Sequence, residues 1–251
     1  MRLTVLGKSP SWQDADGACS GYLVEEDGAR LLLDCGNGVF AKLRAAIDYH
    51  AVDAVLVTHL HADHFIDLVP FAYALTYGPR RRDAPPVLHA PAGALECWRR
   101  VVGAWGNEDL IEAAFAVREY DPAETLHAGP LTIRFQPVPH FVPTNAVELV
   151  AAAGGRLTFG ADHGPSPELC AFARGTDLLL LEATLDAPEE SGVRGHITAA
   201  EAGEHAAAAG ARRLVITHIS DERDLEAARL EAERTFGGPV ELAAAGTQYT
   251  V

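Results

Sequence analysis

The residues best suited to chemistry form one short run, His59-Leu60-His61-Ala62-Asp63-His64, which directly follows the apolar segment 54–58. The apolar segment predicts a strand. His59 and His61, two residues apart in extended backbone, then project to the same side and can bind one metal ion. Asp63 and His64 lie past the bend and point toward a second position nearby. Because imidazole and carboxylate groups are ligands for Zn²⁺ and similar ions, the run predicts a metal site rather than histidines that merely end a strand.

A site for two metal ions needs about seven or eight protein donors, so this run is not sufficient by itself. Three further donors each follow an expected strand: His140, Asp162 and His218, after strands at residues 131–138, 156–159 and 214–217. A carboxylate at Asp162 can bridge two ions with its two oxygen atoms. Alone, each is readily explained as a loop histidine or a capping aspartate. Together with the histidine-rich run, they indicate a two-metal centre.

Composition and charge limit the function classes open to the chain. It has 251 residues, of which 48% are hydrophobic and 22% charged, as is ordinary for a globular protein. No linker or block of charge divides it, so we expect one domain over residues 1–251. The formal charge of −15 argues against a general nucleic-acid-binding protein, because most of the surface would repel phosphate groups. A local pair of divalent cations can still attract a small anionic substrate.

The cysteines and the hydropathy pattern indicate the compartment. Cys19, Cys35, Cys97 and Cys170 are scattered without a C-x-x-C pair. They indicate neither a disulfide framework nor a cysteine zinc site, so we expect reduced thiols in a cytoplasmic protein. The chain shows no signal-peptide pattern and no apolar run of the roughly 18 residues that a membrane-spanning helix needs.

Hydrophobic periodicity predicts strands and helices that alternate along most of the chain. Strands are expected at residues 3–6, 21–25, 30–34, 53–58, 87–89, 131–138, 146–151, 156–159, 177–182 and 214–217, with further strands within 240–251. Helices are expected at residues 39–49, 64–77, 91–102, 108–114, 167–174, 198–210 and 221–236, the second of them continuing through Pro70. Thr198 and Glu201 have the spacing of a capping box, and Asp27-Gly28 is a two-residue hairpin turn.

One internal similarity links the two halves of the chain. Residues 55–60 and 214–219 each consist of an apolar strand that ends in Thr-His and an aliphatic residue. This similarity favours two related halves that face each other across a shared site. Chance is an alternative explanation for six residues, so the similarity is supporting only.

Several motifs occur in the order typical of the metallo-β-lactamase superfamily: Asp34-Cys35-Gly36, the run 59–64, His140, Gly160-Ala161-Asp162 and Thr217-His218-Ile219. The chain resembles that superfamily over essentially its full length. Within it, the chain is most similar to the ribonuclease Z-type phosphodiesterase branch, because of Leu181-Glu182-Ala183-Thr184 and Gly195-His196-Ile197-Thr198. The resemblance implies an α/β fold, a four-layer αββα sandwich of two mixed β-sheets flanked by helices, with the site at the sheet edges. It also leads us to expect a homodimer.

The resemblance implies a role for each site residue. One metal ion is placed on His59, His61 and His140, and the second on Asp63, His64 and His218, with Asp162 bridging the two. We expect zinc, with manganese or iron as alternatives. The two ions would lower the pKa of a shared water to give a bridging hydroxide nucleophile.

The resemblance implies catalytic residues as well. In the branch, the histidine that corresponds to His196 assists the phosphodiester chemistry and the glutamate that corresponds to Glu182 orients it. We therefore expect His196, Glu182 and Asp63 to be catalytic. Asp34 is expected either to orient a ligand histidine or to close the turn before Gly36.

Two departures from the branch bear on the substrate. His163 stands where the branch commonly has threonine or serine, and we expect it in an exposed loop, with a contact to the substrate as the alternative. Only residues 141–161 separate His140 from Asp162, whereas members that process transfer RNA usually carry a long arm there. With no arm and a charge of −15, a transfer RNA substrate is disfavoured.

The overall pattern resembles short bacterial relatives that act as small-molecule phosphodiesterases, including class II cyclic-nucleotide enzymes. This resemblance leads us to expect a phosphodiesterase that acts on a small anionic diester such as a cyclic nucleotide. The alternatives are a ribonuclease Z-type RNA 3′-end endonuclease, a hydrolase of lactones, thioesters or β-lactams, non-haem iron redox chemistry, and a non-catalytic ligand-binding carrier. A carrier would be expected to have lost metal ligands, and a lactone or thioester hydrolase gives the pair of Glu182 and His196 no evident task. Candidates for the pocket wall are Ser9, Ser11, Trp12, residues 141–145 and Arg80–Arg82, although three adjacent arginines are usually a solvated surface.

Overall fold

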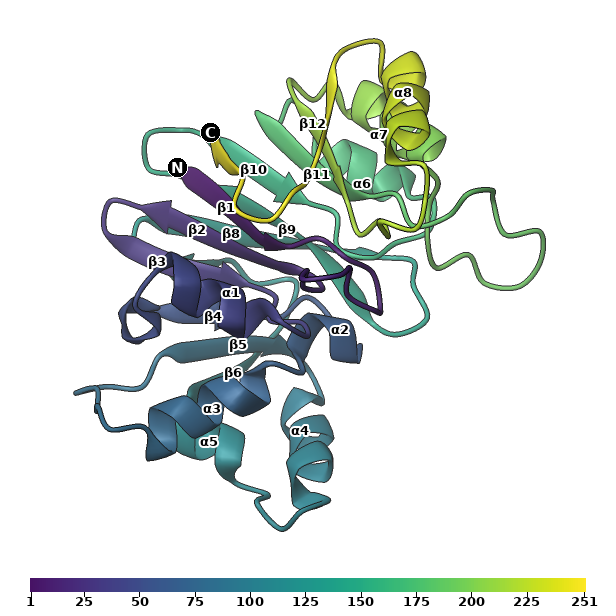
Figure 1. The fold of residues 1–251 in the computed structure, drawn as a ribbon. Coiled ribbons are helices and arrows are strands. Elements are labelled where there is room, and N and C mark those ends of the chain that lie inside the picture. Colours follow the sequence, from purple (N-terminus) through teal and green to yellow (C-terminus); the bar gives the residue numbers. More distant parts are fainter.

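Two seven-stranded mixed sheets lie face to face in the computed structural model, which describes residues 1–251 (Figure 1). The first sheet has the order β14-β1-β2-β3-β4-β5-β6, with bounds β1 Arg2–Gly7, β2 Gly21–Glu26, β3 Ala29–Leu33, β4 Ala54–Leu56, β5 Val87–Pro91, β6 Ala116–Tyr120 and β14 Gln248–Thr250. The second has the order β13-β12-β11-β10-β9-β8-β7, with bounds β7 Leu126–Ala128, β8 Leu131–Val138, β9 Thr144–Val150, β10 Arg156–Phe159, β11 Leu178–Glu182, β12 Leu214–Thr217 and β13 Val240–Leu242.

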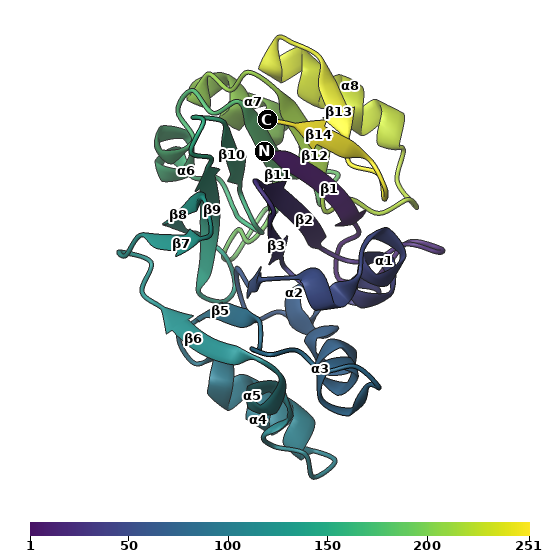
Figure 2. The same cartoon turned by 90° about the vertical axis from the view of Figure 1, so that its left-hand side faces the viewer.

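Helices cover the outer face of each sheet. They are α1 Val39–Ala46, the short 3₁₀ helix η1 Tyr49–Ala51, α2 Ala62–Phe65, α3 Leu68–Tyr77, α4 Ala94–Gly103, α5 Leu110–Ala114, α6 Pro167–Phe172, α7 Ala199–Ala209 and α8 Leu225–Phe236. Helices α1 to α5 lie beside the first sheet and α6 to α8 beside the second (Figures 1 and 2). The expected αββα sandwich is therefore confirmed. None of the helices is long and apolar enough to cross a membrane.

Side chains that alternate between the two faces of each strand contribute to three layers of buried side chains. In β3, Leu31 and Leu33 point into the core between the sheets, while Leu32 belongs to the core beneath α1, α3, α4 and α5. Successive strand residues face opposite sides of a sheet, so a strand that is apolar throughout can fill both cores. A third buried cluster joins the second sheet to α6, α7 and α8. Because helices cover one face of each sheet and the other sheet covers the second face, the polar groups of the site lie at the strand ends.

The two sheets have the same strand pattern, as the internal similarity predicted. In the first, β1, β2 and β3 are antiparallel and β3 to β6 are parallel; in the second, β8, β9 and β10 are antiparallel and β10 to β13 are parallel. The two similar segments, however, end β4 and β12, whereas the shared pattern matches β4 with β11 and β5 with β12. They are therefore not equivalent positions of a repeat.

Two helix predictions were wrong in their extent. The helix expected at residues 64–77 is divided into α2 and α3, because Asp67 is engaged elsewhere between them. Its amide N–H donates to the carbonyl of Cys35 at 3.0 Å, and its carboxylate accepts the N–H of Phe40 at 2.9 Å. The helix expected at residues 39–49 ends at Ala46, after which Asp48 caps η1. Tertiary contacts determine the first boundary, and a local side-chain cap accompanies the second.

The capping box at the start of α7 is confirmed. The Thr198 hydroxyl accepts the Glu201 N–H at 3.2 Å, and the Glu201 carboxylate accepts the Thr198 N–H at 2.9 Å. We expect Thr198→Ala to lower the free energy of unfolding by about 1 kcal/mol, because it leaves a helical N–H without its partner. Urea denaturation measures this, with Thr250→Ala on the exposed strand β14 as the control. A loss no greater than that of the control would contradict the role of the cap.

Candidate metal centre

The expected metal ligands lie at the carboxyl ends of strands from both sheets. The run 59–64 follows β4, with Asp63 and His64 in the single turn of α2. His140 follows β8, Asp162 follows β10 and His218 follows β12. Strand ends that point the same way meet at one edge of a sheet, where ligand sites of α/β proteins commonly form. The topology thus brings together side chains that are up to 159 positions apart.

The backbone turns sharply at this edge. Asp34, Ala161 and His218 all have positive φ, at 58°, 54° and 49°, in the left-handed region that residues other than glycine adopt at a cost. Each is the first or second residue after a strand. This conformation costs about 1–3 kcal/mol per residue, and it persists only where the surrounding structure requires it. Such positions are common at functional sites.

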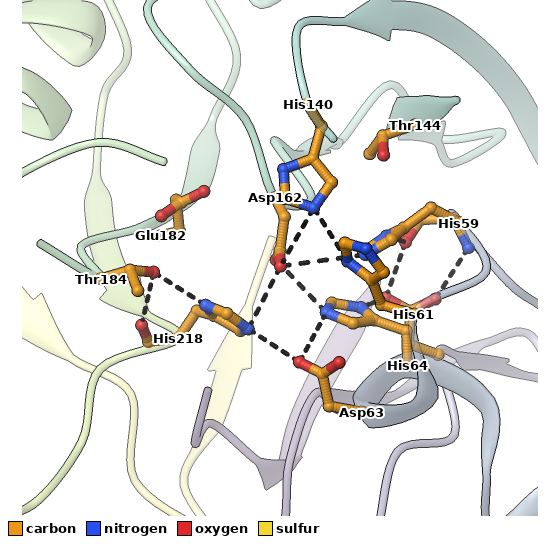
Figure 3. Close-up of polar contacts among 12 residues, drawn as sticks. His59, His61, Asp63, His64, His140, Thr144, Asp162, Glu182, Thr184 and His218 are labelled. Carbon is orange, nitrogen blue, oxygen red and sulfur yellow. Dashed lines mark hydrogen bonds and ion pairs between the residues drawn. The ribbon is translucent and has the colours of Figure 1, made fainter. Parts of the chain in front are cut away.

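The structure groups these ligand atoms into two sets, each contained within 4.8 Å. His59, His61, His140 and Asp162 form the first set, and Asp63, His64, Asp162 and His218 form the second. Figure 3 shows Asp162 between the two, with the imidazoles on either side of its carboxylate. All seven residues that sequence reasoning assigned to metal binding are therefore brought together.

Distances between the atoms fit a small cation. Ligand atoms about 2.1 Å from a tetrahedral zinc ion are about 3.4 Å apart. The Asp162 carboxylate lies 3.3 Å from Nε2 of His64 and 3.3 Å from Nε2 of His218, and Nε2 of His218 lies 3.2 Å from Asp63. In the first set, Nε2 of His140 lies 3.0 Å from Nδ1 of His61. Buried histidine and aspartate clusters of this kind are consistent with a binuclear metal site.

In four of the histidines Nδ1 is hydrogen-bonded to another group, while Nε2 faces the carboxylate of Asp162. Nδ1–H of His64 donates to Asp34 at 2.7 Å, and Nδ1–H of His140 donates to the carbonyl of Gly195 at 2.6 Å. Nδ1–H of His218 donates to Oγ1 of Thr184 at 2.8 Å, and Nδ1–H of His59 donates to Oγ1 of Thr58 at 3.1 Å. Nε2 of His59 and of His64 is buried without any hydrogen-bond partner. A buried lone pair is costly unless something binds it, so the site fits metal ions.

The protonation states of two of the histidines and of the shared carboxylate suit metal binding. Burial lowers the pKa of His59 and of His140, which favours the neutral imidazole that a metal ion needs. Burial by itself would raise the pKa of Asp162, but the neighbouring imidazoles of His218 and His64 hold it well below its usual range. The carboxylate is therefore ionised.

A second arrangement lies beside the metal ligands. Nδ1–H of His196 donates to both oxygens of Glu182, at 3.0 and 3.1 Å, and the fully buried Glu182 also accepts the backbone N–H of His163 at 2.6 Å. Burial acts to lower the pKa of His196, but the hydrogen bond and charge of Glu182 raise it to about 9. Glu182 thus fixes both the orientation and the proton of this imidazole.

Comparison with known proteins agrees with this geometry. The profile of the β-lactamase superfamily domain matches residues 29–219. The chain belongs to the metallo-β-lactamase superfamily. An uncharacterized protein of Mycobacterium tuberculosis is 34% identical over 96% of this chain and 88% of its own length. YhfI of Bacillus subtilis, described as a probable metallo-hydrolase, is 29% identical over 98% of each chain. Ribonuclease Z of Myxococcus xanthus is 30% identical over 97% of this chain and 95% of its own length.

Solved structures agree on the metallo-β-lactamase fold. The crystal structure of YhfI superposes with a TM-score of 0.88 at 27% identity and covers 99% of this chain and 98% of that one. Unliganded yeast PDE1 has a TM-score of 0.73 at 13% identity, covering 98% of each chain, and shares the fold alone. The family and the donor set together indicate a metal-dependent hydrolase.

Asp34 holds two residues of this metallo-β-lactamase centre, His64 and Thr58, through hydrogen bonds. It is fully buried, and besides His64 it accepts the Thr58 N–H at 2.8 Å and the Thr58 hydroxyl at 3.0 Å. Of the two roles expected for Asp34, orienting a ligand histidine is confirmed. We expect Asp34→Asn to weaken zinc affinity by about 10–100-fold, because the amide no longer favours the required His64 tautomer. Titration against a zinc chelator measures this, and an affinity equal to that of wild type would contradict the role.

The pocket over the centre has a volume of about 290 Å³. It is lined by Pro10, Ser11, Trp12, His61, Ala62, Asp63, Asp162, Thr184, His196 and His218. Of the suggested wall residues, Ser11 and Trp12 are present, whereas Ser9 is buried and none of residues 141–145 is among those that line the pocket. Arg80 and Arg82 do not line it: Arg80 pairs with Asp48 at 2.7 Å, and Arg82 binds the carbonyls of His50 and Val52. The arginine cluster therefore belongs to the surface.

The expectation that His163 is exposed was wrong, because its side chain is fully buried. Its Nδ1–H donates to the carbonyl of Gly164 at 2.8 Å, and a Cβ at Gly160 would lie 3.0 Å from the ring. Sequence reasoning also left Thr58 and Thr184 unassigned. Both lie beside residues of the assigned motifs. A hydroxyl side chain next to such a motif was the signal that could have identified them as hydrogen-bond partners of the histidines.

Proposed function

We propose that this chain is a metal-dependent phosphodiesterase that hydrolyses a small phosphodiester such as a cyclic nucleotide. The observation that carries the proposal is the hydrogen-bonded pair of Glu182 and His196, in which His196 lines the same pocket as the metal ligands and Glu182 is buried behind it. A hydrolase needs a group that can give a proton to the leaving oxygen, and the histidine of this pair is placed for that role.

The metal ions and the residues of the site have different roles in the proposed reaction. When bound, two divalent ions supply a water of lowered pKa and neutralise charge on the phosphoryl oxygens. Asp162 and Asp63 anchor the ligand sets that hold the ions beside the pocket. His196 holds a proton on Nε2, on the far side of the ring from Glu182, and gives it to the leaving alkoxide. Glu182 keeps the ring in place and stabilises its positive charge.

Further considerations support a small diester. Ribonuclease Z, a relative at 30% identity, acts on RNA by its name, so cleavage of phosphodiesters is compatible with this sequence. The charge of −15 and the short segment 141–161 argue against transfer RNA. We propose zinc as the resident metal because histidine and aspartate donors suit it, with manganese and iron as alternatives.

The test is an assay of substrate classes. The purified protein, loaded with Zn²⁺ or Mn²⁺, is given bis-p-nitrophenyl phosphate, 3′,5′-cyclic AMP, a lactone and a thioester. We expect turnover of the diesters and little or none of the other two. A protein that carries two metal ions but turns over only the lactone or the thioester would overturn the proposal.

A further inference from the structure

The basic side chains around the pocket are already engaged. Lys8 pairs with Asp14 and donates to the carbonyl of Ile219 at 2.7 Å. Arg194 makes two hydrogen bonds to Glu201, at 2.8 and 2.9 Å. Neither lysine nor arginine is among the residues that line the pocket. Beyond the metal ions and His196, the pocket therefore offers no positive charge to a second anionic group of the substrate.

The remaining binding surface is aromatic. Trp12 lines the pocket and is 52% exposed, which is unusual for so large an apolar side chain. Phe141 is equally exposed, and its ring lies 5.1 Å from His140 and 5.7 Å from His196, centroid to centroid. The metal ligands thus have an exposed aromatic ring on the first loop and another on the segment after β8.

The loop that carries Trp12 and the ring of Phe141 are both held in place before any substrate binds. The loop that carries Trp12 is fixed to the His218 loop, because the carboxylate of Asp14 accepts the Asp221 N–H at 3.1 Å and the backbone carbonyl of Lys8 accepts the Ile219 N–H at 3.2 Å. Phe141 covers Gly195, where a Cβ would lie 2.3 Å from its ring. Little ordering is then required when a planar group stacks there, which favours binding.

We infer that Trp12 stacks on a planar aromatic group of the substrate, with Phe141 as a second wall, so that the preferred diester carries a nucleobase or a comparable ring. This inference rests on the proposed function, since it names the substrate class of the same site. Stacking of one base on an aromatic side chain contributes about 5–150-fold in affinity. Trp12 is therefore a specificity-determining residue.

The test compares two cyclic phosphates that differ only in the base. We measure kcat/KM for 3′,5′-cyclic AMP and for the 3′,5′-cyclic phosphate of 1-O-methylribose, in wild type, Trp12→Ala and Trp12→Phe. Trp105→Ala is the matched control, because Trp105 is also 52% exposed and lies outside the pocket. We expect wild type, Trp12→Phe and the control to prefer cyclic AMP by at least about 5-fold. In Trp12→Ala the preference falls to less than about 2-fold.

A binding measurement separates this inference from the proposed function. Equilibrium dialysis of the phosphorothioate analogue of cyclic AMP needs no turnover, and we expect Trp12→Ala to bind it at least about 5-fold more weakly than wild type and the control. An unchanged affinity in Trp12→Ala, or an unchanged preference between the two substrates, overturns the inference. Absence of diester turnover in wild type overturns the proposed function instead, and the dialysis result then still decides the role of Trp12.

Discussion

Replacing His196 by alanine lowers the turnover of 3′,5′-cyclic AMP by about 10²–10⁴-fold, while the protein keeps its metal ions. The expected size is that of a lost general acid, since the variant has no group to protonate the departing ribose oxygen. Metal content is retained because His196 belongs to neither of the two ligand sets around Asp162. Plasma mass spectrometry and steady-state kinetics measure the two quantities on the same sample.

The leaving group distinguishes proton donation from a structural role. A nitrophenolate departs readily without a proton, so the loss for bis-p-nitrophenyl phosphate is expected to be smaller than for cyclic AMP. Glu182→Gln should also lose more activity toward cyclic AMP than toward bis-p-nitrophenyl phosphate, but by a smaller factor. The amide keeps the His196 ring in place but does not stabilise the positive charge of the ring. His127→Ala, which removes an exposed histidine from β7, serves as the control. Equal losses for both substrates in His196→Ala would rule out a general acid.

The metal ligands could be predicted from the sequence because they obey local rules. His59 and His61 are spaced for extended backbone, Asp63 and His64 begin the next helical turn, and the other donors each follow a buried strand. The order of strands within each sheet does not follow from such rules. It was available only through the resemblance of the motifs to a known family.

The features that sequence reasoning missed depend on distant contacts. His163 is buried because a loop from the other side of the site, with Arg194 and Gly195, packs over Gly164, where a Cβ would lie 2.1 Å from the carbonyl of Arg194. Strands β6 and β7 went unpredicted: both show weak alternation of burial, as edge strands do, and β7 has only three residues. Neither property can be read from neighbouring residues alone.

Replacing Asp162 by alanine removes both metal ions, whereas His61→Ala or His218→Ala removes one. Asp162 is the residue common to the two ligand sets, while His61 belongs only to the first and His218 only to the second. Loss of the shared carboxylate also leaves the first set without any negative charge to offset an ion and the second set with Asp63 alone. We expect about two zinc ions per chain in wild type, about one in each histidine variant and none in Asp162→Ala.

Unfolding experiments provide an independent measurement of the same difference. A ligand that binds only the folded state stabilises it, so a chelator should lower the unfolding temperature of wild type but leave that of Asp162→Ala unchanged. Asp48→Ala, which removes a carboxylate outside both sets, should respond to the chelator as wild type does. If Asp162→Ala still bound one ion per chain, the two sets would be independent sites, and a reaction that requires both ions around one carboxylate would be excluded.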